Sequence, residues 1–118
     1  MAREYNIPGQ TDFYQGKVRD VLFFAKLFIL LKVTNRISAY DVNLGVEIRN
    51  KGEILNRIAA FFLKEASKIV KVWLLENTAT LSFGYYCEPF KIEMVVRRYL
   101  AGSMWKDYKI KGNAFFGE

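Results

Sequence analysis

One long run with helical spacing, set among segments that have the character of β-strands, most constrains what this chain can fold into. From Leu55 to Val70, apolar side chains recur at steps of three and four residues, which is the period of an amphipathic helix. The expected apolar stripe consists of Leu55, Ile58, Ala59, Phe62, Ala66, Ile69 and Val70. Asn50 and Glu53 have the spacing of a capping box, so the sequence predicts a helix that begins there and packs its stripe against a sheet.

The remaining regular structure is expected to be mostly strand. Strands are predicted over residues 14–24, 27–34, 78–83 and 92–97, and residues 37–48 have mixed character with turn residues at Asp41, Asn43 and Gly45. The connection near Ala25 and Lys26 predicts a hairpin, and a short helix is expected from Ser103 to Tyr108. The fold class that follows is α+β: an antiparallel β-sheet with one main packed helix, in a single domain of residues 1–118.

Composition excludes several kinds of chemistry. With 118 residues, 52% of them apolar, the chain has enough material for a hydrophobic core. It has no histidine and one cysteine, which excludes the common zinc spacings, histidine-activated nucleophiles and an internal disulfide. Cys87 is expected to be a small buried side chain. The net charge of +6 favours anionic partners without choosing among nucleotides, phosphorylated metabolites and nucleic acid.

The sequence contains no recognisable targeting signal. The first ten residues lack the apolar core of a signal peptide, and the longest apolar stretch, residues 27–31, is too short to span a bilayer. We therefore expect a cytoplasmic protein with no membrane partner.

Residues 92–103 combine groups that can hold a phosphate. On the predicted strand, alternation separates Arg97 from the anchoring apolar residues, so its guanidinium could face a cleft. Gly102 allows close backbone approach, and Ser103 could cap a helix whose free N–H groups attract an anion. On spacing alone the alternative is favoured, which is an edge strand with solvated arginines and an ordinary capping serine.

Two further segments could bind ligands. In the first predicted strand, Gly16 would permit close backbone approach, and Lys17 and Arg19 would share one face on which two cations could grip a polyphosphate. Ser38 and Asp41 could bond the hydroxyls or amides of a small ligand. The alternatives, a solvated strand face and capped turns, are the more common causes of such patterns.

Four sequence blocks in a fixed order carry a family resemblance. The blocks are GKVRDV, TNRISAYDV, NKGEILNRIAAFF and CEPFKIEMVVRRYLAGSMWKDY, within residues 14–108. Together they resemble the N-terminal part of the phosphoribosylaminoimidazole-succinocarboxamide synthases, or SAICAR synthases. The resemblance implies a kinase-like ATP-binding lobe of a ligase of de novo purine synthesis. With ATP and Mg²⁺, such a ligase joins the carboxylate of carboxyaminoimidazole ribonucleotide to the amine of aspartate, through an acyl phosphate, and releases ADP and phosphate.

The resemblance also implies roles for residues of this chain. The implied ATP-binding residues are Gly16, Lys17, Val18 and Arg19 at the phosphates, and Glu88 and Phe90 in a hinge at residues 87–90 that meets the adenine. The implied substrate-binding residues are Arg97 and Ser103 at the ribonucleotide phosphate, and Ser38 and Asp41 in the substrate pocket. The resemblance assigns no catalytic residue and no metal ligand within the chain.

The chain departs from the family pattern at several positions. Asn35, Lys91, Arg98 and Met104 stand where the family commonly has aspartate, proline, glycine and glycine, respectively. On the predicted strand, Arg98 would face the apolar side, so its guanidinium must find a carboxylate, reach solvent or distort the strand.

The length of the chain leads to a further expectation. The family's Mg²⁺ ligands belong to a second half of the fold, which is expected to be missing here. We therefore expect little or no ligase activity from the chain alone. An interface left uncovered in this way would favour a homo-oligomer or a complementary C-terminal fragment.

Two other functions compete with this interpretation. A non-catalytic basic module could bind single-stranded nucleic acid through its charge and through Tyr85, Tyr86 and Tyr99, although these aromatic residues are better explained as core. An inactive remnant that keeps only the fold is the second alternative. As partners we expect ATP, carboxyaminoimidazole ribonucleotide and aspartate, with nucleic acid ranked well below them.

Overall fold

The computed structural model describes residues 5–40, 42–92, 94–96 and 98–112. The chain divides into two compact units, Met1–Glu88 and Pro89–Glu118, and each unit is described by itself. The sequence-based expectation of one domain over residues 1–118 stays a prediction.

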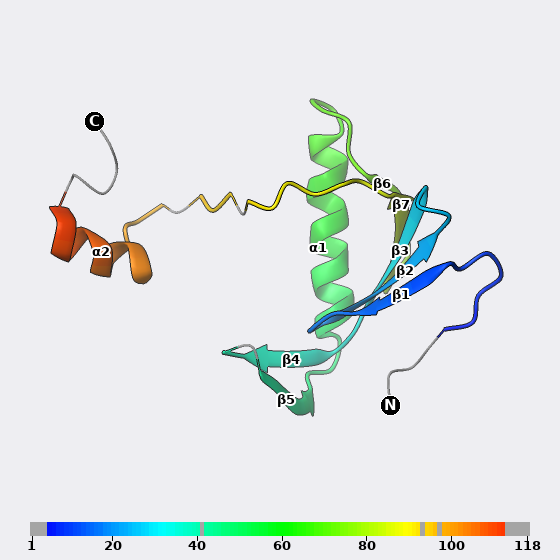
Figure 1. Cartoon of the computed structure of the whole chain (residues 1–118), viewed down its shortest axis with the longest axis horizontal. Coiled ribbons are helices and arrows are strands. Elements are labelled where there is room, and N and C mark those ends of the chain that lie inside the picture. Colours follow the sequence, from blue (N-terminus) through cyan, green and yellow to red (C-terminus); the bar gives the residue numbers. More distant parts are fainter. Residues whose placement is uncertain (1–4, 41, 93, 97, 113–118) are drawn as a thin grey trace. The chain divides into compact units, whose positions relative to one another are not determined.

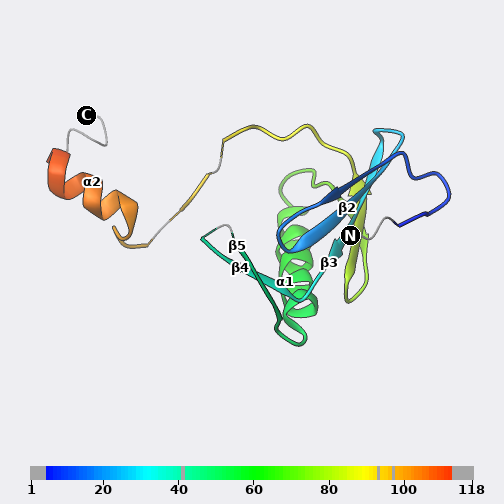
Figure 2. The ribbon, with the colours of Figure 1, turned by 60° about the horizontal axis from the view of Figure 1, so that its bottom comes forward.

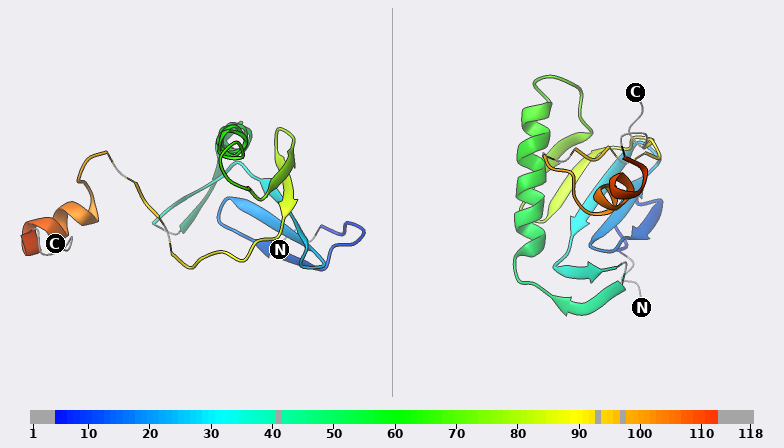
Figure 3. Two further views of the ribbon diagram at one scale, coloured as in Figure 1. Left: turned by 90° about the horizontal axis from the view of Figure 1, so that it is seen from above. Right: turned by 90° about the vertical axis from the view of Figure 1, so that its left-hand side faces the viewer.

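The first unit is an antiparallel sheet with one main helix on it, which confirms the α+β fold class (Figure 1). The five-stranded sheet has the order β1-β2-β3-β7-β6, with β1 at Asp12–Gln15, β2 at Arg19–Phe24, β3 at Phe28–Val33, β6 at Leu74–Asn77 and β7 at Leu81–Tyr85. The helix α1, Lys51–Ala66, contacts β3, β6 and β7, and Figure 3 shows it beside one face of the sheet. A separate pair, β4 at Arg36–Ala39 and β5 at Val42–Glu47, leads from the sheet into α1 (Figure 2).

The hairpin predicted near Ala25 and Lys26 is confirmed. Both residues have positive φ, 50° and 55°, as the central residues of a type I′ turn do, and this turn twist suits the strands that it joins. Leu27 N–H donates to the carbonyl of Phe24 at 2.9 Å and closes the turn between β2 and β3.

The first predicted strand, residues 14–24, is wrong as one element. The chain reverses at residues 16–18, so β1 and β2 form a second hairpin in which Gln15 pairs with Asp20. Gly16 N–H donates to the carbonyl of Arg19 at 2.7 Å across this reversal. Lys17 therefore lies in a turn, whereas Arg19 begins a strand. The two residues do not share one strand face as predicted.

The sheet-facing side of α1 differs from the predicted apolar stripe. Leu55, Ile58 and Phe62 are 42%, 50% and 64% exposed, whereas the buried residues of α1 are Gly52, Asn56 and Ala60. The spacing of four is helical, but the side chains are small or polar. Because the helix approaches the sheet closely, these residues fit where leucine or phenylalanine would not. A Cβ atom on Gly52 would lie 2.7 Å from the carbonyl oxygen of Thr34.

The start of α1 is correctly predicted, but its capping is not. Asn50 precedes the helix with φ 64° and makes no side-chain cap bond. The side-chain oxygen that accepts a hydrogen bond from the helix N-terminus belongs to a residue that is distant in the sequence. Asn35 Oδ1 accepts a hydrogen bond from Gly52 N–H at 3.1 Å. Glu53 instead forms an ion pair with Arg57, at 2.7 Å between Oε1 and Nη2.

Asn56 connects α1 to the turn between β6 and β7. Its Nδ2 donates to the carbonyls of Thr78 and Leu81 at 3.1 and 3.2 Å, and its Oδ1 accepts a hydrogen bond from Ser82 Oγ at 2.8 Å. The same turn shortens the strand predicted over residues 78–83, which begins only at Leu81 in β7. One buried amide thus fixes where the helix crosses this part of the sheet.

The second unit contains the predicted short helix, but its described residues do not form the predicted strand. Helix α2 spans Ser103–Lys111, and its N-cap is Gly102 with φ 68°, so Ser103 is the first helical residue and not the cap. The described residues among 89–101 form no strand, and Val96 is 98% exposed. An alternating apolar pattern makes a strand only when a neighbouring strand completes the ladder, and none pairs with these residues.

Two further expectations about single side chains are resolved. Arg98 is exposed and its guanidinium lies 5.6 Å from the ring centroid of Tyr99, so of the three outcomes considered it reaches solvent. Cys87 is exposed, which corrects the expectation of a buried thiol.

Among the described residues, no helix has the length and apolar character needed to cross a membrane.

Candidate functional site

The turn between β1 and β2, residues 16–18, is held from one side through three consecutive carbonyl groups. Arg36 Nη2 donates to the carbonyl of Gly16 at 2.9 Å, and Arg36 Nε donates to that of Lys17 at 3.3 Å. Thr34 donates to the carbonyl of Val18 twice, through Oγ1 at 2.8 Å and through its backbone N–H at 3.1 Å. Thr34, just after β3, and Arg36, the first residue of β4, therefore bind every carbonyl of this turn.

This arrangement directs the amides of the turn to the opposite side. In a planar trans peptide the C=O of one residue and the N–H of the next point in opposite directions. With the carbonyls of Gly16 and Lys17 directed at Arg36, the N–H groups of Lys17 and Val18 point away from it. Successive backbone N–H groups that share a direction favour an anion, and the side chains of Lys17 and Arg19 are exposed beside them.

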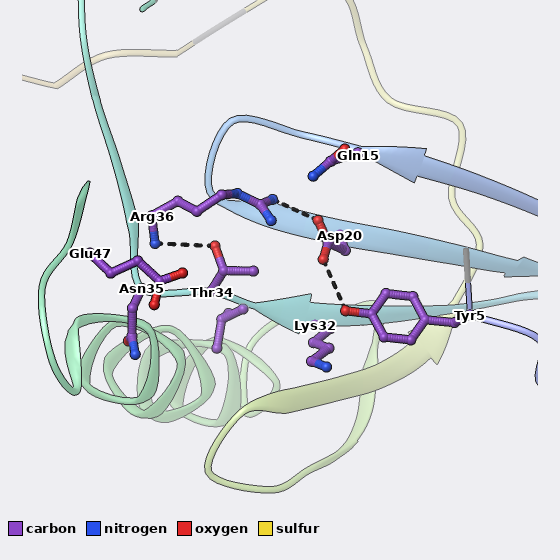
Figure 4. Close-up of a pocket in the computed structure, with 9 residues that line it drawn as sticks. Tyr5, Gln15, Asp20, Lys32, Thr34, Asn35, Arg36 and Glu47 are labelled. Carbon is purple, nitrogen blue, oxygen red and sulfur yellow. Dashed lines mark hydrogen bonds and ion pairs between the residues drawn. The ribbon is translucent and has the colours of Figure 1, made fainter. Parts of the chain in front are cut away.

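Behind the turn lies a buried ion pair. Asp20 is 3% exposed, and its Oδ1 lies 2.6 Å from Nη2 of Arg36. Tyr5 Oη donates to the other carboxylate oxygen of Asp20 at 3.2 Å. Figure 4 shows both contacts. Because a carboxylate so buried is costly without a counterion, Arg36 neutralises Asp20 as well as binding the turn.

A cavity of about 380 Å³ adjoins this ion pair (Figure 4). It is lined by Tyr5, Gln15, Asp20, Lys32, Val33, Thr34, Asn35, Arg36 and Glu47. Lys32 Nζ lies 4.5 Å from the ring centroid of Tyr5, so this cation is already placed over an aromatic face. The cavity wall thus carries both signs of charge.

The sequence did not identify Asp20, Thr34 and Arg36 as parts of the site. Asp20 and Leu22 are two residues apart in β2 and so lie on the same face of the strand, and both are buried. A carboxylate at an inward strand position needs a nearby cation, and this requirement could have indicated that Asp20 has a buried basic partner. The pairing of Asp20 with Arg36 depends on the path of the chain from β3 into β4, which no local pattern predicts.

The predicted substrate-binding residues are only partly described. Ser38 is half-buried in β4 and pairs with Asn43 across the β4–β5 ladder. Asp41 and Arg97 lie outside the described residues. Ser103 begins α2 in the second unit, where Phe90 is exposed, and Glu88 is exposed at the end of the first unit. Their approach to a common ligand stays a prediction.

Two of the three tyrosines considered for nucleic-acid stacking already contact other rings. Tyr85 stacks on Phe28 with 5.8 Å between ring centroids, and Tyr86 meets Phe23 edge-on at 5.9 Å. Both cover apolar side chains of the sheet. This packing does not favour the nucleic-acid alternative.

Gly16→Ala should destabilise the turn. An added Cβ would lie 2.8 Å from the carbonyl oxygen of Arg19, which is the atom that accepts the Gly16 N–H. The backbone must shift and weaken that bond, and we expect unfolding free energy to fall by about 1–3 kcal/mol. Urea denaturation monitored by circular dichroism measures this. Gln15→Ala, at the exposed preceding residue, should change stability by less than about 0.5 kcal/mol. Equal effects of the two substitutions would show that the turn tolerates a side chain.

Comparisons with known proteins agree on one family. The sequence model of the family described as SAICAR synthetase matches residues 12–116. Two curated relatives, both named phosphoribosylaminoimidazole-succinocarboxamide synthase, come from Azobacteroides pseudotrichonymphae and Cytophaga hutchinsonii. They are 48% and 46% identical over 106 residues, which is 89% of this chain. The chain covers 33% and 34% of their sequences, so it spans about a third of their length.

Solved structures give the same match. A SAICAR synthase from Saccharomyces cerevisiae, complexed with SAICAR, superposes with a TM-score of 0.78 at 25% identity, over 95% of this chain and 46% of that one. A second structure, titled SAICAR synthase, gives a TM-score of 0.79 at 26% identity, over 92% and 45% of the two chains.

Proposed function

Because this chain belongs to the SAICAR synthetase family, we propose that it forms the ATP-binding N-terminal lobe of a ligase of purine biosynthesis. The reaction is the joining of carboxyaminoimidazole ribonucleotide to L-aspartate in an amide, with conversion of ATP to ADP and phosphate. The observation that carries the proposal is the turn at residues 16–18, whose carbonyls are bound from one side by Thr34 and Arg36. Its amides and the exposed Lys17 then serve the triphosphate.

The proposed role of the turn is electrostatic. A phosphoryl group in transfer needs positioned donors and cations more than a protein nucleophile, which suits a chain without histidine. Lys17 and Arg19 would offset the charge of the phosphates, and the amides of Lys17 and Val18 would orient them. Close approach is possible because Gly16 has no side chain.

The other proposed contacts follow the family resemblance. Glu88 and Phe90 would meet the nucleotide at the hinge, Arg97 and Ser103 would bind the ribonucleotide phosphate, and Ser38 and Asp41 would line the substrate pocket. A cytoplasmic location fits these soluble small-molecule substrates. A homo-oligomer or a complementary C-terminal fragment stays a prediction, as does low ligase activity of the chain alone.

The reaction would need Mg²⁺ to neutralise the clustered phosphate charge. The described residues contain no set of side chains that could bind it. No three acidic or cysteine side chains among them lie close enough together to hold a metal ion. The absence of metal ligands from this lobe stays a prediction, and none of the roles proposed for its residues depends on the metal.

Lys17→Ala should weaken ATP binding by about tenfold, which corresponds to the loss of one charge-assisted contact of about 1.4 kcal/mol. Isothermal titration calorimetry of the 118-residue chain with ATP measures the affinity. Lys68→Ala is the matched control, because it removes the same charge from an exposed ion pair with Glu65 at the far end of α1. If ATP binds Lys17→Ala and the unsubstituted chain equally, the assignment of the phosphate turn is refuted.

A further inference from the structure

Arg36 makes a set of contacts that the proposed function does not explain. One guanidinium binds the carbonyls of Gly16 and Lys17 and the buried carboxylate of Asp20, at 2.9, 3.3 and 2.6 Å. These three groups belong to the turn and to the strand that follows it. The side chain is 17% exposed, so most of its surface is enclosed by its partners.

The geometry of these contacts requires the shape of arginine. A guanidinium is planar and carries five N–H donors in a fixed arrangement, so it can bind a carboxylate and two carbonyls at once. Asp20 fixes the plane of that group, because it is buried and itself held by Tyr5. A lysine at position 36 could still neutralise Asp20, but it would present a single ammonium to all three acceptors.

The main chain of Arg36 is fixed as well. Its carbonyl accepts a hydrogen bond from Lys51 Nζ at 3.0 Å, at the first residue of α1. Next to it, Asn35 Oδ1 accepts from Gly52 N–H at 3.1 Å, and Asn35 O accepts from Ile48 N–H at 3.0 Å. The side chain that reaches the turn therefore starts from a backbone tied to the helix and to the end of β5.

From these contacts we propose that Arg36 is a positioning residue for ATP, one that acts by holding the turn at residues 16–18 and does not touch the nucleotide itself. The inference rests on the proposed function, since it names what sets the direction of the phosphate-binding amides. Asp20 has the supporting task of orienting Arg36. A purely structural role for the ion pair predicts a different result, namely that every substitution in the pair affects binding only in proportion to the stability it removes.

The test compares Arg36→Lys with Asp20→Asn in the 118-residue chain. Arg36→Lys keeps a cation beside Asp20 and loses the paired contacts to the turn. Asp20→Asn keeps Arg36 and an oxygen acceptor for it. We expect ATP affinity by calorimetry to fall about tenfold in Arg36→Lys and less than about threefold in Asp20→Asn. The thermal midpoint of Arg36→Lys should fall no further than that of Asp20→Asn.

A second readout needs no nucleotide. Amide hydrogen exchange of Gly16, whose N–H is bonded to the carbonyl of Arg19 across the turn, should be faster in Arg36→Lys than in the unsubstituted chain when followed by NMR without ligand, with unchanged exchange in β3. The inference is overturned if exchange in the turn is unchanged, or if the loss of ATP affinity follows the loss of stability across both variants. If the unsubstituted chain does not bind ATP, the proposed function fails, and the exchange rates alone then support or overturn the holding of the turn by Arg36.

Discussion

Gly84→Ala should lower the free energy of unfolding by about 3 kcal/mol or more, the largest effect that we expect from adding a single methyl group. A Cβ at this position of β7 would lie 2.0 Å from the carbonyl oxygen of Trp73 and 2.7 Å from its ring. That carbonyl accepts the N–H of Tyr85 at 2.8 Å, and Gly84 itself pairs with Ile29 and Leu74 on its two sides. The backbone is therefore fixed on both flanks and cannot yield without breaking the ladder.

Urea unfolding monitored by tryptophan fluorescence measures the Gly84 effect, since Trp73 lies at the site. Gly45→Ala is the control: Gly45 has φ 69°, but an added Cβ would meet no atom within 4 Å. This control carries only the left-handed backbone strain of about 1–2 kcal/mol. If both variants lose the same stability, close packing of Trp73 on Gly84 is not what limits the position.

Asn56→Leu should also destabilise the first unit by about 3 kcal/mol, although leucine is apolar and similar in size. The substitution removes the side-chain donor from the carbonyls of Thr78 and Leu81 and leaves the hydroxyl of Ser82 without its acceptor. The Leu81 carbonyl keeps the backbone N–H of Thr78 at 2.9 Å, and the Thr78 carbonyl keeps Asn77 Nδ2 at 3.3 Å. Each lost hydrogen bond costs about 0.5–1.5 kcal/mol and the unsatisfied hydroxyl of Ser82 costs about 1–3 kcal/mol, and the new apolar contacts recover part of that loss. The free energy of unfolding from urea denaturation is the measurement.

Ser82→Ala separates the contributions at this site. It removes only the donor to Asn56 Oδ1 and should cost about 1 kcal/mol. Because the two side chains share that bond, the double variant Asn56→Leu, Ser82→Ala should lose less than the sum of the single losses. A strictly additive double variant, or an Asn56→Leu variant as stable as the original, would contradict the role given to this amide.

The features that the sequence predicted correctly are those set by residues close together in the chain. The turn at Ala25 and Lys26, the start of α1 and the helix from Ser103 each depend on a few neighbouring residues. The family assignment also depends on local blocks, and the comparisons confirm it. Gly16, Lys17 and Arg19 were predicted to lie in one strand, whereas Gly16 and Lys17 lie in the turn and Arg19 begins β2. Their role at the phosphates stays a prediction.

The features that were predicted wrongly depend on what each segment packs against. The side of α1 that meets the sheet is selected by small size, at Gly52 and Ala60, and by hydrogen bonding, at Asn56. A pattern based on hydrophobicity points to a different side of the helix. Residues 92–97 have the alternation of a strand, but alternation does not supply a pairing partner. The contacts of Arg36 with the turn and with Asp20 likewise join residues that are between 16 and 20 positions apart in the sequence.

Asn35 has a consequence for how the first unit responds to acid. The family resemblance implies an aspartate at this position, and here the oxygen that accepts the hydrogen bond from the N-terminus of α1 belongs to an amide. A carboxylate would attract the positive end of the helix more strongly, but it would lose that charge on protonation. An amide does not titrate in water. The hydrogen bond between Asn35 and the Gly52 N–H therefore loses no acceptor charge when the solution is acidified.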